Sequence, residues 1–154
     1  MASEGYFFIA DLLGFANMIS NLKEADCDER VEGWISLVKE ATTKAGVTQF
    51  QLISDTLFAA APATSAGLGS LVKLARHLLN EGVPQSYPIR GAITFGTYQW
   101  GDLIYGKAVI NAHKLEAAQN WVGVSCTPTL PHTPDFLASI SWSCTSLLRR
   151  RGSP

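Results

Sequence analysis

The chain lacks an excess of charge of either sign, and this argues against binding through electrostatic attraction alone. Lys and Arg number 12 against 13 Asp and Glu over 154 residues, which gives a net charge of −1. Domains that bind nucleic acid or an anionic membrane surface usually present a basic patch or stripe. The one basic run, at 149–151, stands at the end of the sequence and is interpreted as a solvated tail. We therefore expect neither nucleic acid nor a membrane surface as a partner.

Paired cysteines and long apolar runs are also missing. Cys27, Cys126 and Cys144 are odd in number and show no C-x-x-C spacing, which argues against a disulfide framework and against a zinc site. No stretch approaches the roughly 20 apolar residues of a membrane span. The apolar run at 6–10 is too short for the core of a signal peptide and is closed by Asp11. These absences predict a soluble protein of a reducing cytoplasm.

What the chain does contain is apolar sequence with few charges, at 47% hydrophobic and 16% charged residues. This composition is typical of a globular domain with a real core. Periodic elements cover residues 1–126, and we predict one domain there. Residues 127–154 hold three prolines within eight residues, then a Ser-rich apolar patch. This C-terminal tail has no clear periodic element, and we assign it no structure.

Strands and helices are mixed along the predicted domain, in the order β-α-α-β-β-α-β-β-α-β. This order favours an α+β fold, in which helices cover a mainly antiparallel sheet. The expected strands are 6–12, 48–54, 56–61, 89–95 and 121–126, with a second hairpin or loop at 96–106. The expected helices are 15–22, a helix capped by Asp28 and stopped by Gly46, an apolar stripe from Leu68 to Leu79 stopped by Gly82, and 107–120.

Two acidic residues interrupt these apolar strands. Asp11 follows five apolar residues, and Asp55 stands between Leu52-Ile53-Ser54 and Thr56-Leu57-Phe58, beside a tight hairpin turn. A carboxylate at such a place must be paired, capped or metal-bound, because burying it alone is costly. Asp often caps a turn, and spacing alone slightly favours that interpretation. The alternative is that both converge on Mg²⁺ or Mn²⁺, which prefer oxygen ligands.

The residues after Asp11 form a possible phosphate contact. Leu12-Leu13-Gly14-Phe15 runs from a strand through a glycine turn into a helix start. Backbone N–H groups at such a junction can face a triphosphate, and the helix dipole favours an anion there. One glycine at a strand–helix junction is a weak signal when taken alone, and an ordinary turn is then the favoured interpretation.

Four short motifs then stand in a meaningful order. They are Asp11-Leu12-Leu13-Gly14-Phe15, Ser54-Asp55-Thr56, Arg90-Gly91-Ala92-Ile93 with Gly96, and Gly106 with its following helix. Over roughly residues 6–126 this order resembles the class III nucleotidyl cyclases. The resemblance implies a ferredoxin-like class III cyclase core that works as a head-to-tail homodimer with sites at the interface.

In that scheme Asp11 and Asp55 bind two divalent ions, Mn²⁺ or Mg²⁺, with help from the Leu12 carbonyl. The backbone of 13–15 cradles the phosphates of a nucleoside triphosphate. The ribose 3′-hydroxyl attacks the α-phosphorus, giving a cyclic nucleotide and pyrophosphate.

Departures from the family pattern narrow the expected substrate. Gln51 and Leu103 stand where purine cyclases commonly carry the adenine-reading Lys and Asp. The transition-state Asn and Arg of the interface helix fall at Ile110 and Lys114, and Lys114 keeps the positive charge without the guanidinium fork. Arg90 is another candidate for stabilising the developing charge, with a surface or structural Arg as the alternative.

A more specific resemblance is to the bacterial pyrimidine cyclases of the Pycsar antiphage system. It rests on the segments 8–15, 53–58 and 121–123. It implies UTP as the first choice of substrate and CTP as the second, converted to cyclic UMP or cyclic CMP respectively. The product would act as a second messenger in antiviral defence by activating a separate effector.

Phe50, Gln51 and Thr56 are the predicted substrate contacts near Asp55. An aromatic ring can stack on a pyrimidine, and Gln offers a donor and an acceptor to its edge. Core packing is the alternative for Phe50. Two rival functions remain: a catalytically inactive cyclase fold serving as a regulatory or dimerisation module, and a polymerase-palm or diguanylate cyclase relative. The second lacks a Gly-Gly-Asp-Glu-Phe-like hairpin.

Overall fold

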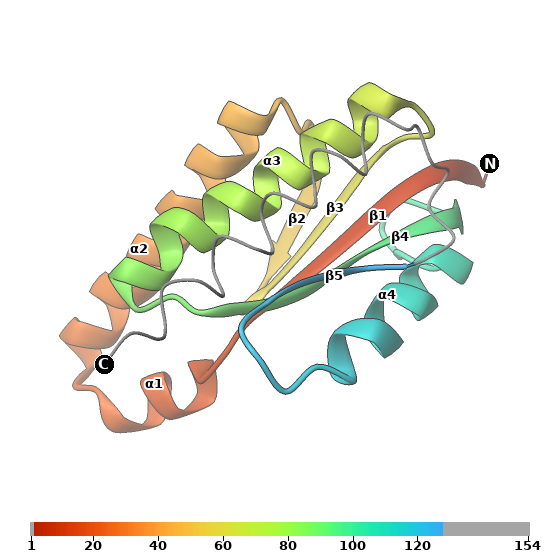
Figure 1. Ribbon diagram of the computed structural model, residues 1–154. Coiled ribbons are helices and arrows are strands. Elements are labelled where there is room, and N and C mark those ends of the chain that lie inside the picture. Colours follow the sequence, from red (N-terminus) through yellow and green to blue (C-terminus); the bar gives the residue numbers. More distant parts are fainter. Residues whose placement is uncertain (1, 128–154) are drawn as a thin grey trace, which may run out of the picture.

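The structure is a computed structural model, and it describes residues 2–127 as a five-stranded sheet with helices on both faces (Figure 1). The elements in chain order are β1 (Ser3–Leu12), α1 (Phe15–Asn21), α2 (Glu24–Ala45), β2 (Gln49–Ile53), β3 (Thr56–Pro62), α3 (Ser65–Gly82), the 3₁₀ turn η1 (Val83–Gln85), β4 (Ile89–Tyr98), α4 (Lys107–Ala117) and β5 (Gly123–Cys126). The predicted tail beyond Thr127, including Cys144, lies outside the described residues. No helix within residues 2–127 is long and apolar enough to cross a membrane.

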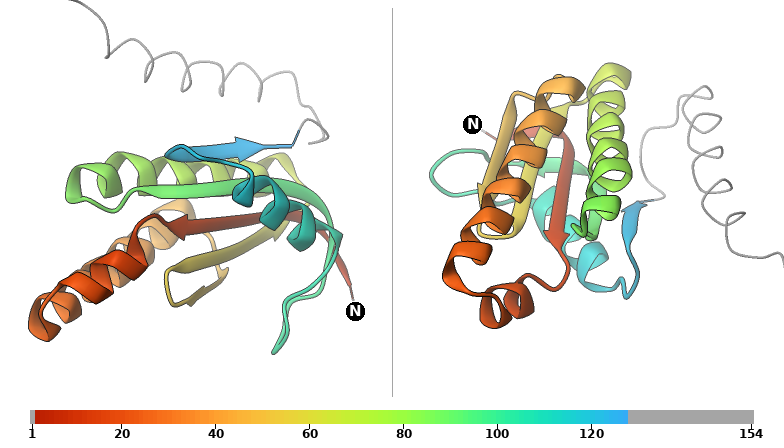
Figure 2. Two further views of the ribbon diagram at one scale, coloured as in Figure 1. Left: turned by 90° about the horizontal axis from the view of Figure 1, so that it is seen from below. Right: turned by 90° about the vertical axis from the view of Figure 1, so that its left-hand side faces the viewer.

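The strands lie in the order β2-β3-β1-β4-β5, so that β1 is the central strand. It pairs antiparallel with β3 and with β4, β2 pairs antiparallel with β3, and only the β4–β5 pair is parallel. Helices α2 and α3 cover one face of the sheet and α4 covers part of the other (Figure 2). The predicted α+β class, with a mainly antiparallel sheet between helices, is confirmed.

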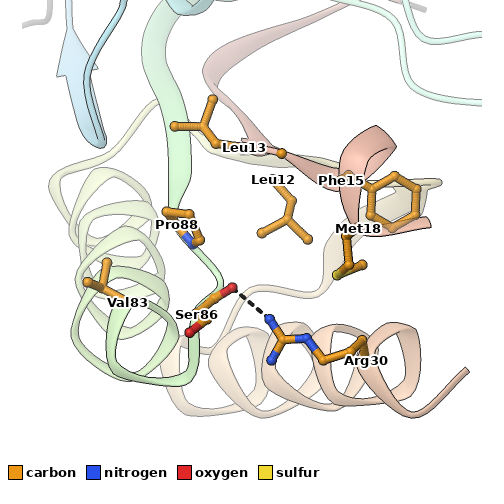
Figure 3. A pocket seen from close by; sticks show the side chains of 9 residues that line it. Leu12, Leu13, Phe15, Met18, Arg30, Val83, Ser86 and Pro88 are labelled. Carbon is orange, nitrogen blue, oxygen red and sulfur yellow. Dashed lines mark hydrogen bonds between the residues drawn. The ribbon is translucent and has the colours of Figure 1, made fainter. Parts of the chain in front are cut away.

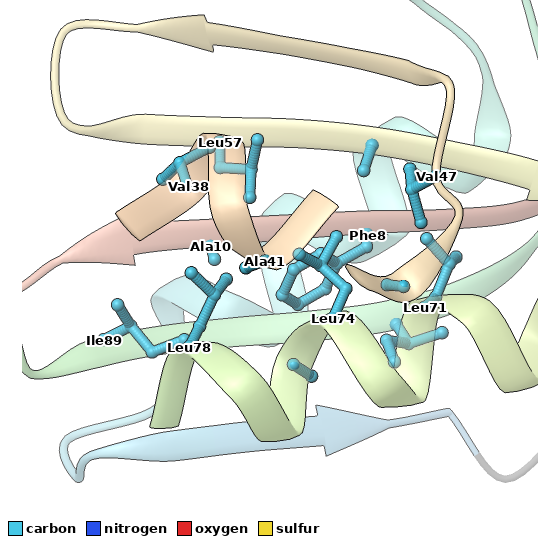
Figure 4. Close-up of a cluster of buried hydrophobic side chains, with 14 of the residues drawn as sticks. Phe8, Ala10, Val38, Ala41, Val47, Leu57, Leu71, Leu74, Leu78 and Ile89 are labelled. Carbon is cyan, nitrogen blue, oxygen red and sulfur yellow. The ribbon is translucent and has the colours of Figure 1, made fainter. Parts of the chain in front are cut away.

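Alternation along β1 decides which side chains face which helices. Its even-numbered residues from Tyr6 to Leu12 pack with α2 and α3 in the larger core cluster, part of which Figure 4 shows. The odd-numbered Phe7 and Ile9 pack against α4. Phe7 is fully buried, and burying such a side chain contributes about 1.5–3 kcal/mol. Because side chains alternate between faces, Asp11 lies on the α4 face.

The predicted cap of the second helix is wrong, and the predicted end of the fourth strand is too early. Helix α2 begins at Glu24 with Lys23 as its N-cap residue, so Asp28 lies inside the helix instead of capping it. Glu24 and Asp26 in the first turn complement the helix dipole and extend the helix in that direction. The segment 96–106, predicted as a hairpin or loop, is a loop: β4 continues to Tyr98, beyond its predicted end at Phe95, and a single antiparallel bridge between Gln99 and Tyr105 closes the loop.

Other predicted boundaries agree with the structure. The turn between β2 and β3 falls at Ser54-Asp55, where Ser54 adopts the left-handed conformation with φ 57°. Gly46 ends α2 with φ 69°. Helix α4 starts directly after Gly106, and Thr94 Oγ1 donates to the Ala108 carbonyl across 2.8 Å, which fixes the start of the helix to β4.

Gly106 allows α4 to start so close to the sheet. Its φ is 138°, and a Cβ at this position would lie 2.5 Å from the Thr97 carbonyl oxygen. We expect Gly106→Ala to reduce the free energy of unfolding by about 1–3 kcal/mol, because both the backbone conformation and the contact are unfavourable for a side chain. Gly101→Ala is the control, since a Cβ there meets nothing within 4 Å. Urea denaturation measures both; equal stability of the two variants would contradict the prediction.

Candidate functional site

The site is built around Asp11 near the end of β1. In the sheet register Asp11 pairs with Thr56 on β3 and with Arg90 on β4. Thr56 Oγ1 donates a hydrogen bond to Asp11 Oδ1 across 3.2 Å. On the other side, Arg90 Nη2 lies 3.6 Å from Asp11 Oδ2. The Asp11 side chain is 26% exposed, so solvent can reach it.

Asp55 stands beside it in the β2–β3 turn. Its backbone carbonyl accepts a hydrogen bond from Leu12 N across 3.3 Å, which ties the turn to the end of β1. The pKa of Asp11 is raised above its ordinary value, first by burial and then by the negative charge of Asp55, with a smaller contribution from Glu116. The hydrogen bond from Thr56 and the charge of Arg90 lower this pKa without reversing the shift. Two carboxylates 44 positions apart in sequence are therefore brought within electrostatic reach of each other.

The alternative that each Asp caps a turn finds no support in the hydrogen bonds. Within residues 2–127, no backbone N–H donates to the side chain of Asp11 or Asp55. Two partly exposed carboxylates that repel each other suit a hard divalent cation. Among the same residues, no group of three or more His, Cys, Asp or Glu could hold a metal ion. A cation on this pair would need water and phosphate oxygens as further ligands, which is the usual arrangement for Mg²⁺.

The predicted phosphate loop is only partly available for a ligand. The Leu13 N–H donates to the Pro88 carbonyl across 2.8 Å and is already used. Gly14 adopts φ 82° and precedes α1, which begins at Phe15. The first N–H groups of a helix have no partner within the helix. The N–H groups of Gly14 and Phe15 are thus the ones that could meet a phosphate.

A cavity of about 360 Å³ lies beside this loop, and Figure 3 shows the side chains that line it. Neither Asp11 nor Asp55 lines it. Arg30 of α2 does: its guanidinium donates to the carbonyl oxygens of Gln85 and Ser86 across 2.9 Å each and lies 4.4 Å from the centre of the Tyr87 ring. Sequence reasoning missed Arg30, because its partners are 55 and 56 positions away. The cavity thus includes the predicted phosphate loop but neither carboxylate.

Arg90 is held by helix α4. Its Nε donates a short hydrogen bond to Glu116 Oε1, and its Nη1 donates to the Gln119 carbonyl across 3.1 Å. The Glu116 side chain is only 5% exposed. Sequence reasoning also missed Glu116, although a signal was present: Ala108, Ala112 and Glu116 recur every four residues and form the buried stripe of α4.

Lys114, the predicted charge-stabilising residue on α4, is exposed and is not in contact with Asp11 or Arg90 through any hydrogen bond or ion pair of residues 2–127. The charged groups that act on Asp11 are Asp55, Glu116 and Arg90, and Lys114 is not one of them. Ile110, one turn before Lys114, is 55% exposed. The outward side of α4 therefore carries both positions that depart from the family pattern.

The two predicted base contacts on β2 lie on opposite faces of the sheet. Phe50 shares its face with Leu52, which packs against the core under α2 and α3. Gln51 is exposed on the face that Asp11 shares. The structure brings Gln51 to the side of the carboxylates and does not bring Phe50 there.

Known proteins resemble this chain in structure and not in sequence. No protein-family model matches the chain, and no curated protein matches it. Among solved structures, the guanylate cyclase domain of RhGC from Catenaria anguillulae in complex with GTP is 18% identical, with a TM-score of 0.64 over 77% of this chain and 75% of that one. The adenylyl cyclase CyaB from P. aeruginosa is 18% identical, with a TM-score of 0.59 over 77% of this chain and 73% of that one.

The monomeric guanylyl cyclase domain of RhoGC from Blastocladiella emersonii is 16% identical, with a TM-score of 0.64 over 77% of each chain. The chain has the class III cyclase fold. This confirms the predicted class III cyclase core as a fold. Identities of 16–18% carry the likeness no further than the fold.

The raised pKa of Asp11 predicts a pH-dependent effect of its removal. A carboxyl group whose pKa is higher in the folded than in the unfolded state destabilises the folded protein when it ionises. This cost is absent below the ordinary pKa, grows as pH rises from the ordinary to the raised value, and is fully present above the raised value. We therefore expect Asp11→Asn to be more stable than the wild type at pH 7 and equally stable at pH 3, in the presence of EDTA.

Urea denaturation at matched pH values tests this, with Asp102→Asn as an exposed control outside the site. Effects of titrating groups that do not interact with Asp11 cancel in the difference between variant and wild type at one pH, whereas the relief of repulsion on Asp55 and Glu116 is part of the expected gain. A stability gain for Asp11→Asn that shrinks as pH rises would contradict the prediction.

Proposed function

We propose that this chain is a nucleotidyl cyclase that converts a pyrimidine nucleoside triphosphate, UTP in the first place, to the 3′,5′-cyclic monophosphate and pyrophosphate. The observation that carries the proposal is that Asp11 and Asp55 lie within electrostatic reach of each other at the end of β1 in a class III cyclase fold. The proposed cofactors are two divalent cations, Mn²⁺ or Mg²⁺.

The reaction closes one bond and opens another. The ribose 3′-oxygen bonds to the α-phosphorus, the bond from that phosphorus to the bridging oxygen breaks, pyrophosphate leaves, and the hydroxyl proton passes to solvent. Bound cations would lower the pKa of the ribose 3′-hydroxyl and neutralise the charge of the triphosphate. The carboxylates of Asp11 and Asp55, with the Leu12 carbonyl, would hold these cations, and Thr56 orients Asp11 through its hydrogen bond. The backbone N–H groups of Gly14 and Phe15 would bind phosphate oxygens.

A second copy of the chain completes the proposed site. Among residues 2–127, no helix packs over β2 on the sheet face that carries Asp11. Lys114 and Ile110 lie on the exposed side of α4. In a head-to-tail homodimer the outward side of one α4 faces the partner's carboxylates. Lys114 would then place its charge near the triphosphate bound to the other copy, although an ammonium lacks the fork of an Arg.

Gln51 and Leu103 support a pyrimidine substrate. Gln51 is exposed on the face of the carboxylates, and Leu103 is 69% exposed. An amide can pair with the edge of a uracil ring through one donor and one acceptor. Cyclic UMP would then serve as a cytoplasmic second messenger of antiphage defence that activates a separate effector.

Two alternatives keep specific support. CTP in place of UTP is compatible with Gln51, because a Gln side chain can rotate its amide to match either base. A catalytically inactive regulatory or dimerisation module is favoured by Ile110 and Lys114, which replace the transition-state pair expected on α4.

One experiment separates these functions. The purified protein is incubated with each of the four ribonucleoside triphosphates and Mn²⁺ or Mg²⁺, and the products are identified by mass spectrometry. We expect cyclic UMP and pyrophosphate, and we expect Asp55→Ala to lower product formation by at least about 100-fold in a folded dimer, since the loss of a metal ligand removes several kcal/mol of transition-state stabilisation. Asp28→Ala is the matched control, because Asp28 is exposed on α2, across the sheet from Asp11. No turnover of any triphosphate would contradict the proposal.

Substrate choice gives a further prediction. Gln51→Lys combined with Leu103→Asp should raise the ratio of ATP to UTP turnover about 10-fold or more, because a recognition pair changes specificity through its hydrogen bonds. Both side chains are exposed, so the double variant should fold like the wild type. Competition between equal concentrations of ATP and UTP measures the ratio. An unchanged ratio would show that these two positions do not contact the base.

A further inference from the structure

We infer that Glu116 is a positioning residue that holds Arg90 away from Asp11 and so keeps the Asp11 carboxylate available to a divalent cation. The inference rests on the proposed function, in which Asp11 is a metal ligand. It gives a role to a buried carboxylate that no motif in the sequence marks.

The geometry of the Arg90 guanidinium shows how its donors are divided. Its Nε donates to Glu116 Oε1 and its Nη1 to the Gln119 carbonyl, both on or just after α4. Its Nη2 stands 3.6 Å from Asp11 Oδ2, beyond the 2.7–3.2 Å range of an N–H···O hydrogen bond. Arg90 therefore donates its hydrogen bonds to Glu116 and Gln119. Its positive charge lies near Asp11 but makes no hydrogen bond to the Asp11 carboxylate.

Glu116 is well placed to keep this division. Ala112 and Ala108, one and two turns before it, are fully buried against the sheet and fix the helix. Gln119 anchors the segment just after the helix by donating from Nε2 to the Gly91 carbonyl across 2.6 Å. A buried carboxylate left without its cation is strongly unfavourable. Arg90 thus cannot move fully onto Asp11 without leaving Glu116 with only the exposed His113 side chain, whose Nδ1 lies 3.8 Å from Glu116 Oε2.

Removing the charge of Glu116 should shift Arg90 from Glu116 towards Asp11. Asp11 is then the carboxylate that remains within ion-pair distance of Arg90. An Arg–carboxylate pair can form two parallel hydrogen bonds and use both carboxylate oxygens. Those are the oxygens that a divalent cation would need, so Arg90 would compete with the metal.

The test is a titration of the full chain with Mn²⁺ alone, followed by electron paramagnetic resonance of the free ion. Glu116→Gln should weaken Mn²⁺ binding about 10-fold or more, which is the usual effect of losing a group that supports a metal ligand. In an Arg90→Gln background the same substitution should change affinity by less than about twofold, because the competing cation is gone. Glu81→Gln, which removes an exposed carboxylate from α3, is the control.

Glu116→Asp gives a second reading if Glu116→Gln does not fold. It keeps the charge but shortens the side chain by one methylene, so the hold on Arg90 loosens and Mn²⁺ affinity should fall several-fold, again only when Arg90 is present. Circular dichroism checks the fold of each variant. Wild-type affinity in the folded Glu116 variants, or an equal loss without Arg90, would overturn the inference while leaving the metal pair in place. If the wild type binds no Mn²⁺, or if Asp55→Ala binds it equally well, the proposed metal pair fails and the inference with it.

Discussion

The register of β1 between β3 and β4 is the constraint on which the site depends. It places Asp11 opposite Thr56 on one side and Arg90 on the other. A shift of one residue would turn Asp11 into the core under α2 and α3 and move Phe8 out of it. Phe7 and Phe8 are both fully buried, on opposite faces. Packing on two faces at once therefore fixes the position of the carboxylate, and no local feature of Asp11 is needed to do so.

The two faces of the sheet differ in the side chains that they carry. The face under α2 and α3 holds the larger core cluster. Its buried residues come mainly from β1, β3, β4, α2 and α3, and their role is to pack together and exclude water. The α4 face carries the polar groups: Asp11, Thr56, Arg90 and Glu116 lie there, next to a smaller cluster. Because Arg90 bridges from β4 to α4, the orientation of that helix and the electrostatic surroundings of Asp11 are coupled.

Local signals in the sequence predicted most of the fold. Apolar runs and glycine stops marked the sheet and the helices, and carboxylates inside apolar runs marked Asp11 and Asp55. The start of α2 was misplaced because Asp28 is a good cap residue, yet the acidic residues before it extend the helix. For the segment after Tyr98 the sequence left a hairpin and a loop open, and the structure has a loop closed by one bridge, with an exposed tip that offers no face to bury.

Contacts distant in sequence were the part that could not be predicted. Arg90 and Glu116 are 26 positions apart and Arg30 and Ser86 are 56 apart, and nothing in either segment names its partner. The separation of Phe50 from Gln51 is different, since the alternation of a strand already implies it. Leu52 on the buried side was the available signal that Phe50 belongs with the core.

The most direct measurement of the central claim is a crystal structure of the protein soaked with Mn²⁺ and a UTP analogue that cannot be cyclised, with anomalous scattering used to find the metal. The account predicts two anomalous peaks within about 2.0–2.6 Å of carboxylate oxygens of both Asp11 and Asp55, the range for oxygen ligands of hard divalent cations, with the triphosphate on the same side of the sheet. Manganese bound elsewhere, or a nucleotide in the cavity beside Arg30 with no metal on either carboxylate, would contradict it.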